Sequence, residues 1–96
     1  MMAPALDIQT VQDLRNYIYE NICEHNELEP GIFQMTERLL TRGGKQCGVF
    51  FCLYGPRSVR LTAIWETDGN SVLFYDSAGE RTSIMRLTQA PKLAPS

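Results

Sequence analysis

The chain has 96 residues, of which 44% are hydrophobic and 21% are charged, and its formal net charge at pH 7 is −2. A chain of this length and composition folds as one domain with its own core, which excludes a wholly disordered protein. No apolar run approaches the ~20 residues of a membrane-spanning helix and no secretory signal opens the sequence, so we expect a cytoplasmic protein with no membrane partner.

The charges are unevenly distributed along the chain. Residues 1–37 contain seven acidic residues and one basic residue, whereas residues 38–96 contain eight basic and four acidic residues. If these segments occupy different sides of the fold, one side will attract an anionic partner or the acidic side of a second copy.

The first predicted element is a helix over residues 8–26. Four apolar residues recur at the helical period and form one stripe: Val11, Leu14, Ile18 and Ile22. Either Asp7 or Thr10 suits the N-cap position, and Pro30 stops the helix before Glu29. The stripe predicts that the helix packs on another apolar layer.

Short apolar segments separated by turn residues follow, which is typical of an antiparallel meander. Five strands are expected, at residues 33–42, 46–54, 58–67, 71–76 and 81–87. The pairs Gly43-Gly44 and Asp68-Gly69 favour hairpins between them. Residues 32–42 also fit a second helix that ends at Gly43. Residues 89–96 contain two prolines and are expected to form a flexible tail after a single domain over 1–88.

These elements predict an α+β fold in which the N-terminal helix packs on a four- or five-stranded antiparallel meander. A small closed β-barrel with an N-terminal helix is the alternative, because a single helix covers only one face of the sheet.

Two of the three cysteines lie on the strand predicted at 46–54, and its geometry separates them. Cys47 and Cys52 are five residues apart, so they point to opposite faces and lie ~17 Å from each other, which excludes a disulfide. The same geometry opposes a structural zinc site, and neither a metal nor a cofactor is expected. Three free thiols fit a reducing compartment.

The two adjacent phenylalanines of this strand also point to opposite faces. Val49, Phe51 and Leu53 form one apolar face, whereas Phe50, Cys52 and Tyr54 form the other. One face packs against the helix, and the other needs a second cover. An uncovered apolar face is typical of an association surface.

The second face is therefore the predicted interface. Its expected residues are Phe50, Tyr54, Ile64 and Phe74, with Val72 and Ile84 on the same face. The sequence predicts a non-catalytic interaction or assembly module that self-associates as a homodimer or larger oligomer through this face, with another protein as a further possible partner.

The alternative prediction is an anion site for single-stranded nucleic acid or another phosphate ligand. In a meander, alternate turns meet at one end of the sheet, which brings Arg57 and Arg81 to the same end as Arg60. Arginine beside glycine-bearing turns suits phosphate. Catalysis is not expected, because no nucleophile or phosphate-binding motif is present and the single histidine, His25, suits the end of the helix.

Overall fold

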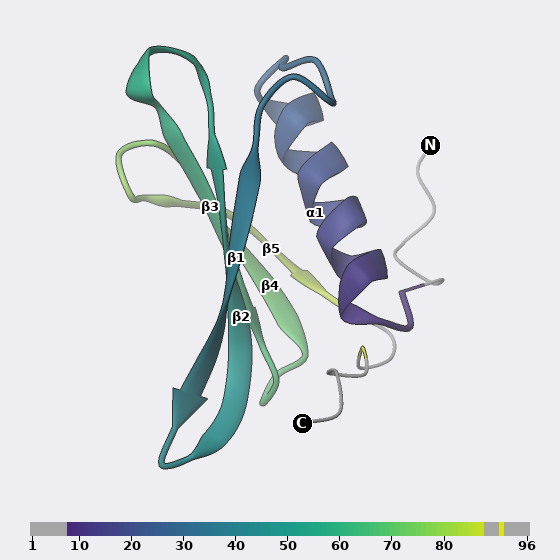
Figure 1. Ribbon diagram of the computed structural model, residues 1–96. Helices are drawn as coiled ribbons and strands as arrows, with labels where there is room; N and C mark the ends of the chain where they lie inside the picture. The colour runs from purple at the N-terminus through teal and green to yellow at the C-terminus, as the bar shows by residue number, and fades with distance from the viewer. Residues whose placement is uncertain (1–7, 88–90, 92–96) are drawn as a thin grey trace.

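One helix packs on one face of a five-stranded antiparallel sheet (Figure 1). The computed structural model describes residues 8–87 and residue 91. The candidate cap Asp7 and the tail predicted at 89–96, apart from residue 91, lie outside these described residues. None of the described residues belongs to a helix long and apolar enough to cross a membrane.

Helix α1 (Val11–His25) has Thr10 as its N-cap, the second of the two cap residues suggested by the sequence. The Thr10 hydroxyl accepts a hydrogen bond from the Asp13 amide at 3.1 Å, and the Asp13 carboxylate accepts one from the Thr10 amide at 3.3 Å. This capping box satisfies backbone donors that the first turn leaves free. At the other end, the Asn26 side-chain amide donates to the carbonyl of Ile22 at 2.8 Å.

The sheet follows the order of the chain, and consecutive strands pair antiparallel. Its strands are β1 (Met35–Arg42), β2 (Lys45–Tyr54), β3 (Arg60–Glu66), β4 (Ser71–Tyr75) and β5 (Arg81–Arg86). The α+β meander is confirmed. Residues 35–42 form a strand, so the second-helix alternative for 32–42 is wrong, and the open strand order rules out the closed barrel.

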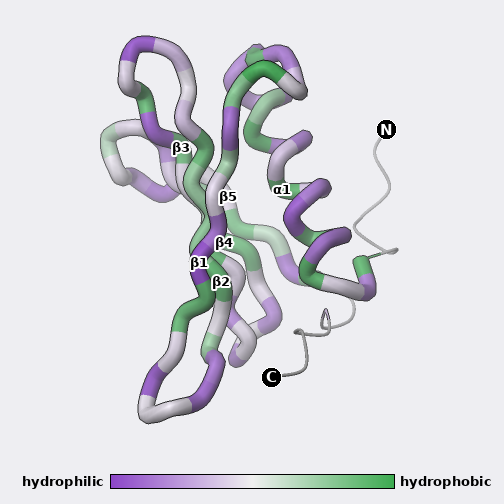
Figure 2. The backbone as a smooth tube through the Cα atoms, viewed as in Figure 1, coloured by the Kyte–Doolittle hydropathy of each residue, from purple (hydrophilic) through white to green (hydrophobic). Residues whose placement is uncertain are grey.

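The core lies between α1 and one face of the sheet. The helix contributes Leu14, Ile18 and Ile22, which are at most 4% exposed. The sheet contributes the alternate residues that face the helix: Met35, Val49, Phe51, Leu53, Leu61, Ala63, Trp65, Val72 and Phe74. Figure 2 shows this arrangement as hydrophobic stretches in the central strands and hydrophilic stretches on the helix.

Polar contacts fix the helix against the β1 edge of the sheet. The Arg15 guanidinium lies 2.8 Å from the Glu37 carboxylate and also donates to the carbonyl of Met35 at 2.9 Å. The Tyr19 hydroxyl donates to the carbonyl of Phe33 at 2.6 Å. These contacts hold α1 on one side of the sheet, and no described helix or strand lies over the opposite side (Figure 1).

Candidate functional site

The candidate site is the outer face, by which we mean the face of the sheet that points away from α1. One apolar row crosses it, because the cross-strand register pairs Phe50 with Ile64, Ile64 with Leu73, and Leu73 with Ile84. Arg38 continues the row on β1 through its pairing with Phe50. Directly opposed residues on antiparallel strands share a face and contact each other.

The apolar residues of the outer face differ in exposure. Ile84 and Tyr54 keep 55% and 44% of their surface exposed, whereas Phe50 and Ile64 are half-buried. Leu73 is only 6% exposed because it lies between Ile64 and Ile84 on the neighbouring strands. The outer face is thus apolar along its centre. Its two exposed large side chains are Ile84, at the β5 end of the apolar row, and Tyr54, beside the row on β2.

Arginine dominates the charges of the outer face. The register places four arginines there, Arg38, Arg60, Arg81 and Arg86, and one acid, Glu66. The guanidinium of Arg60 lies over the ring of Tyr54, 5.8 Å from its centroid. Exposed acidic residues instead lie on the helix and on the loop after it: Glu20, Glu24, Glu27 and Glu29. The uneven charge of the sequence therefore becomes a difference between the two sides of the molecule.

A hollow of about 460 Å³ lies on the β1–β3 half of the outer face. Arg38 and Arg60 line it together with Phe50, Cys52 and Tyr54. Two arginines and two aromatic residues thus share the hollow with one acid, Glu37, which is paired with Arg15. Such a surface suits the face of a planar group together with an anion, or a complementary protein side chain.

The predicted interface residues do not all lie on this face. Phe50, Tyr54 and Ile64 do, but Phe74 pairs with Ala63 on the helix-facing side and is 7% exposed in the core. The prediction that placed Phe74 on the second face is therefore wrong, and so is that for Val72, which is fully buried beneath the helix. Leu73, which the sequence analysis did not assign to the site, occupies the outer face instead.

The three predicted anion-binding arginines lie at one end of the sheet. Arg57 lies in the short 3-10 turn η1 (Pro56–Ser58), with a left-handed backbone conformation at φ 58°. Arg60 begins β3 and Arg81 begins β5. The β2–β3 and β4–β5 connections share the upper end of the sheet in Figure 1. All three side chains are exposed, and Arg60 is the one that lines the outer-face hollow.

Two basic residues of the outer face were missed by the sequence analysis. Arg38 lies opposite Phe50 because the β1–β2 register shifts by one residue between Leu40 and Thr41. Arg86 reaches the outer face through its pairing with Ser71. Counting from the Gly43-Gly44 turn without this shift would pair Arg38 with Val49 on the helix-facing side, so the turn alone does not place Arg38 on the outer face.

All three cysteines are free thiols. Burial raises the pKa of the Cys23 thiol above its ordinary value of 9.0, and a hydrogen bond with Tyr19 opposes part of this rise. Cys23 lies in the core and Cys52 in the outer-face hollow. The raised pKa keeps Cys23 protonated and unreactive at neutral pH.

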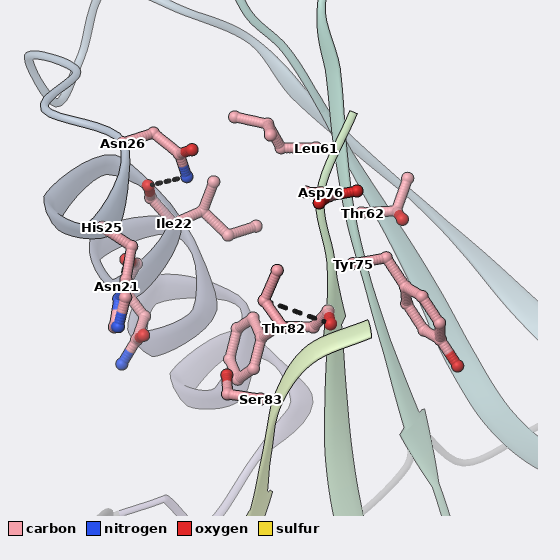
Figure 3. Close-up of a pocket in the computed structure, with 11 residues that line it drawn as sticks. Asn21, Ile22, His25, Asn26, Leu61, Thr62, Tyr75, Asp76, Thr82 and Ser83 are labelled. Carbon is pink, nitrogen blue, oxygen red and sulfur yellow. Dashed lines mark hydrogen bonds between the residues drawn. The ribbon is translucent and has the colours of Figure 1, made fainter. Parts of the chain in front are cut away.

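A second, smaller hollow of about 140 Å³ lies between the C-terminal half of α1 and strands β4 and β5 (Figure 3). His25 and Asp76 line it, but their polar atoms serve the local backbone. The His25 ring contacts the carbonyl of Asn21 at 3.1 Å. The Asp76 carboxylate accepts hydrogen bonds from the amides of Ala78 and Glu80. The polar groups of His25 and Asp76 are therefore engaged by the end of the helix and by the β4–β5 turn rather than directed at a ligand.

Neither metal ligands nor likeness to a known protein assigns a role to these surfaces. Within residues 8–87 and 91, no three His, Cys, Asp or Glu side chains gather closely enough to hold a metal ion. No family model, curated protein or solved structure matches this chain. The outer face is therefore interpreted from its own chemistry.

Proposed function

We propose that this protein is a non-catalytic interaction module that associates with a second copy of itself through the outer face. The observation that carries the proposal is the apolar row from Phe50 to Ile84, which crosses four strands on the side of the sheet opposite α1. A sheet with two apolar faces requires a layer on each face. Three free thiols also suit the cytoplasm as its location.

The size of the outer face sets the expected affinity. Five strands at a spacing of ~4.8 Å and about seven residues at ~3.3 Å give a footprint of roughly 500 Å². Specific interfaces bury about 800 Å² of accessible surface on each partner, and those at the small end are weak or transient. We therefore expect a reversible dimer with a dissociation constant in the micromolar range.

The test is the solution mass by light scattering from about 1 μM to about 1 mM, a range that spans the expected micromolar affinity. Phe50→Arg places a charge in the middle of the apolar row and should shift the protein to monomer. Ile32→Arg is the matched control, because Ile32 is 62% exposed but lies in the loop before β1. A monomeric wild type, or equal effects of both substitutions, would refute self-association through this face.

The outer-face hollow favours a second candidate function, the binding of single-stranded nucleic acid. Arg38 and Arg60 lie beside Phe50 and Tyr54 in this hollow. Aromatic rings stack on bases of any sequence, and neighbouring arginines bind the phosphates. The net charge of −2 for the whole chain opposes this function, whereas the arginine-rich outer face supports it.

Fluorescence anisotropy with a labelled oligothymidylate tests the second candidate. Binding should weaken about hundredfold for a tenfold rise in salt if three phosphates are contacted. Tyr54→Ala and Arg60→Gln should each weaken it further, whereas Arg42→Gln, at the far end of β1, should not. Loss of binding in the Arg42 variant alone, or no binding at low salt, would reject nucleic acid as the ligand.

A further inference from the structure

Strand β3 carries opposite charges at its two ends, both on the outer face. Arg60 is its first residue and Glu66 its last, and both are exposed. They are six positions apart along the strand, so they share a face and lie about 20 Å apart. β3 is also the central strand of the five, so any partner centred on the outer face covers both ends.

Two copies packed face to face have a limited choice of symmetry. A closed dimer has a two-fold axis, and when two sheets pack with their strands aligned, this axis lies in the plane between them, either along the strands or across them. An axis along β3 places Arg60 over the Arg60 of the partner subunit and Glu66 over the Glu66 of the partner subunit. An axis across β3 at its centre places Arg60 over the partner subunit's Glu66. Facing like charges oppose the first arrangement, and facing opposite charges favour the second.

The inference rests on the self-association proposed above. We propose that the second copy docks with its β3 antiparallel to β3 of the first, and that two Arg60–Glu66 ion pairs fix the register. The apolar row of one copy then lies over a row made of Cys52, Thr62, Tyr75 and Arg81 of the partner subunit. This arrangement is compatible with the aligned packing of two twisted sheets, in which the strands of one sheet cross those of the other at about 30°.

Charge reversal at the two ends of β3 tests the arrangement at low salt. Arg60→Glu or Glu66→Arg alone turns two attractive pairs into two repulsive ones, so each should raise the dimer dissociation constant about tenfold or more. The double variant, Arg60→Glu with Glu66→Arg, exchanges the charges and should return to within about threefold of the wild type. Arg38→Glu with Glu66→Arg is the matched control and should not recover, because Arg38 lies over a threonine in this arrangement.

The outcomes separate this inference from the proposed function. A wild-type chain that remains monomeric overturns self-association itself. A wild-type dimer that Phe50→Arg disrupts, but in which the single reversals have no effect or the double variant does not recover, overturns only the register. Circular dichroism checks that each variant is folded. If a variant does not fold, wild-type dimers of labelled and unlabelled chains provide the test. Nuclear Overhauser effects between the Ile64 methyl groups and the methyl group of Thr62 of the partner subunit support the register, and their absence overturns it.

Discussion

Phe50 and Phe51 are neighbours in the chain with opposite surroundings. Phe51 has no exposed surface and packs under α1, whereas Phe50 is half-buried on the outer face. Phe51→Arg should therefore unfold the domain, because a buried unpaired charge costs several kcal/mol out of a total stability of ~5–15 kcal/mol. Phe50→Arg should leave the fold intact. Circular dichroism and urea unfolding measure both, and equal losses of stability would mean that both faces are core.

Titration of the Cys23 thiol makes the free energy of unfolding depend on pH. Because burial raises the pKa of its thiol above 9.0, the folded protein keeps a proton that the unfolded chain releases. The free energy of unfolding is therefore at its full value below about pH 9 and falls as the pH rises through the folded pKa. Urea unfolding from about pH 8 to about pH 10.5 should show a steeper loss for the wild type than for Cys23→Ala. Parallel curves would contradict the raised pKa.

The residue pattern of each strand determined whether its two faces could be assigned from the sequence. β3 alternates Arg60, Thr62 and Glu66 with buried apolar residues, so its faces could be assigned from sequence. The residues of β4, S-V-L-F-Y, are almost all apolar, and alternation alone does not tell which set faces the helix. The ladder from Trp65 to Val72 decides it, and this contact is invisible in the local pattern. Phe74 was misplaced for that reason.

At the scale of single elements, β2 approaches β3 closely at Gly48. A Cβ added at Gly48 would collide with the carbonyl oxygen of Trp65, whereas one added at Gly55 would make ordinary contacts, the nearest at 3.6 Å. Gly48→Ala should therefore lower the free energy of unfolding by about 2 kcal/mol or more, and Gly55→Ala by less than about 0.5 kcal/mol. Urea midpoints measure the difference. Similar midpoints for the two variants would show that the strands separate easily at Gly48.

The sequence predicted the type of most elements but left β1 ambiguous. Residues 32–42 carry apolar positions that suit either a helix or a strand, and the local pattern does not separate them. Distant contacts decide the outcome. β1 pairs along β2, and Arg15 of the helix contacts both Glu37 and the Met35 carbonyl. The start of α1 was ambiguous for a similar reason, because Asp7 and Thr10 both suit a cap, and the contact of Thr10 with Asp13 settles it.

In the whole molecule, acidic residues gather on the helix side and arginines on the outer face. The salt dependence of binding to the outer face therefore distinguishes the two candidate partners. A rise in sodium chloride from about 0.05 M to about 0.5 M screens two ion pairs but not apolar burial, so the dimer should weaken by less than about tenfold. Nucleic acid held by three arginines would weaken about hundredfold. Light scattering and anisotropy across the same salt series compare them. A dimer as salt-sensitive as nucleic acid binding would contradict an apolar interface.

The meander leaves β1 and β5 as the two terminal strands of the described sheet, each with one side free of a strand partner. Both carry arginines, Arg38 and Arg42 on β1 and Arg81 and Arg86 on β5. Charged side chains on such edges oppose the addition of a further strand. The sheet therefore resists growth in its own plane. Self-association through the outer face alone, as proposed, would stop at two copies and would not build a fibre.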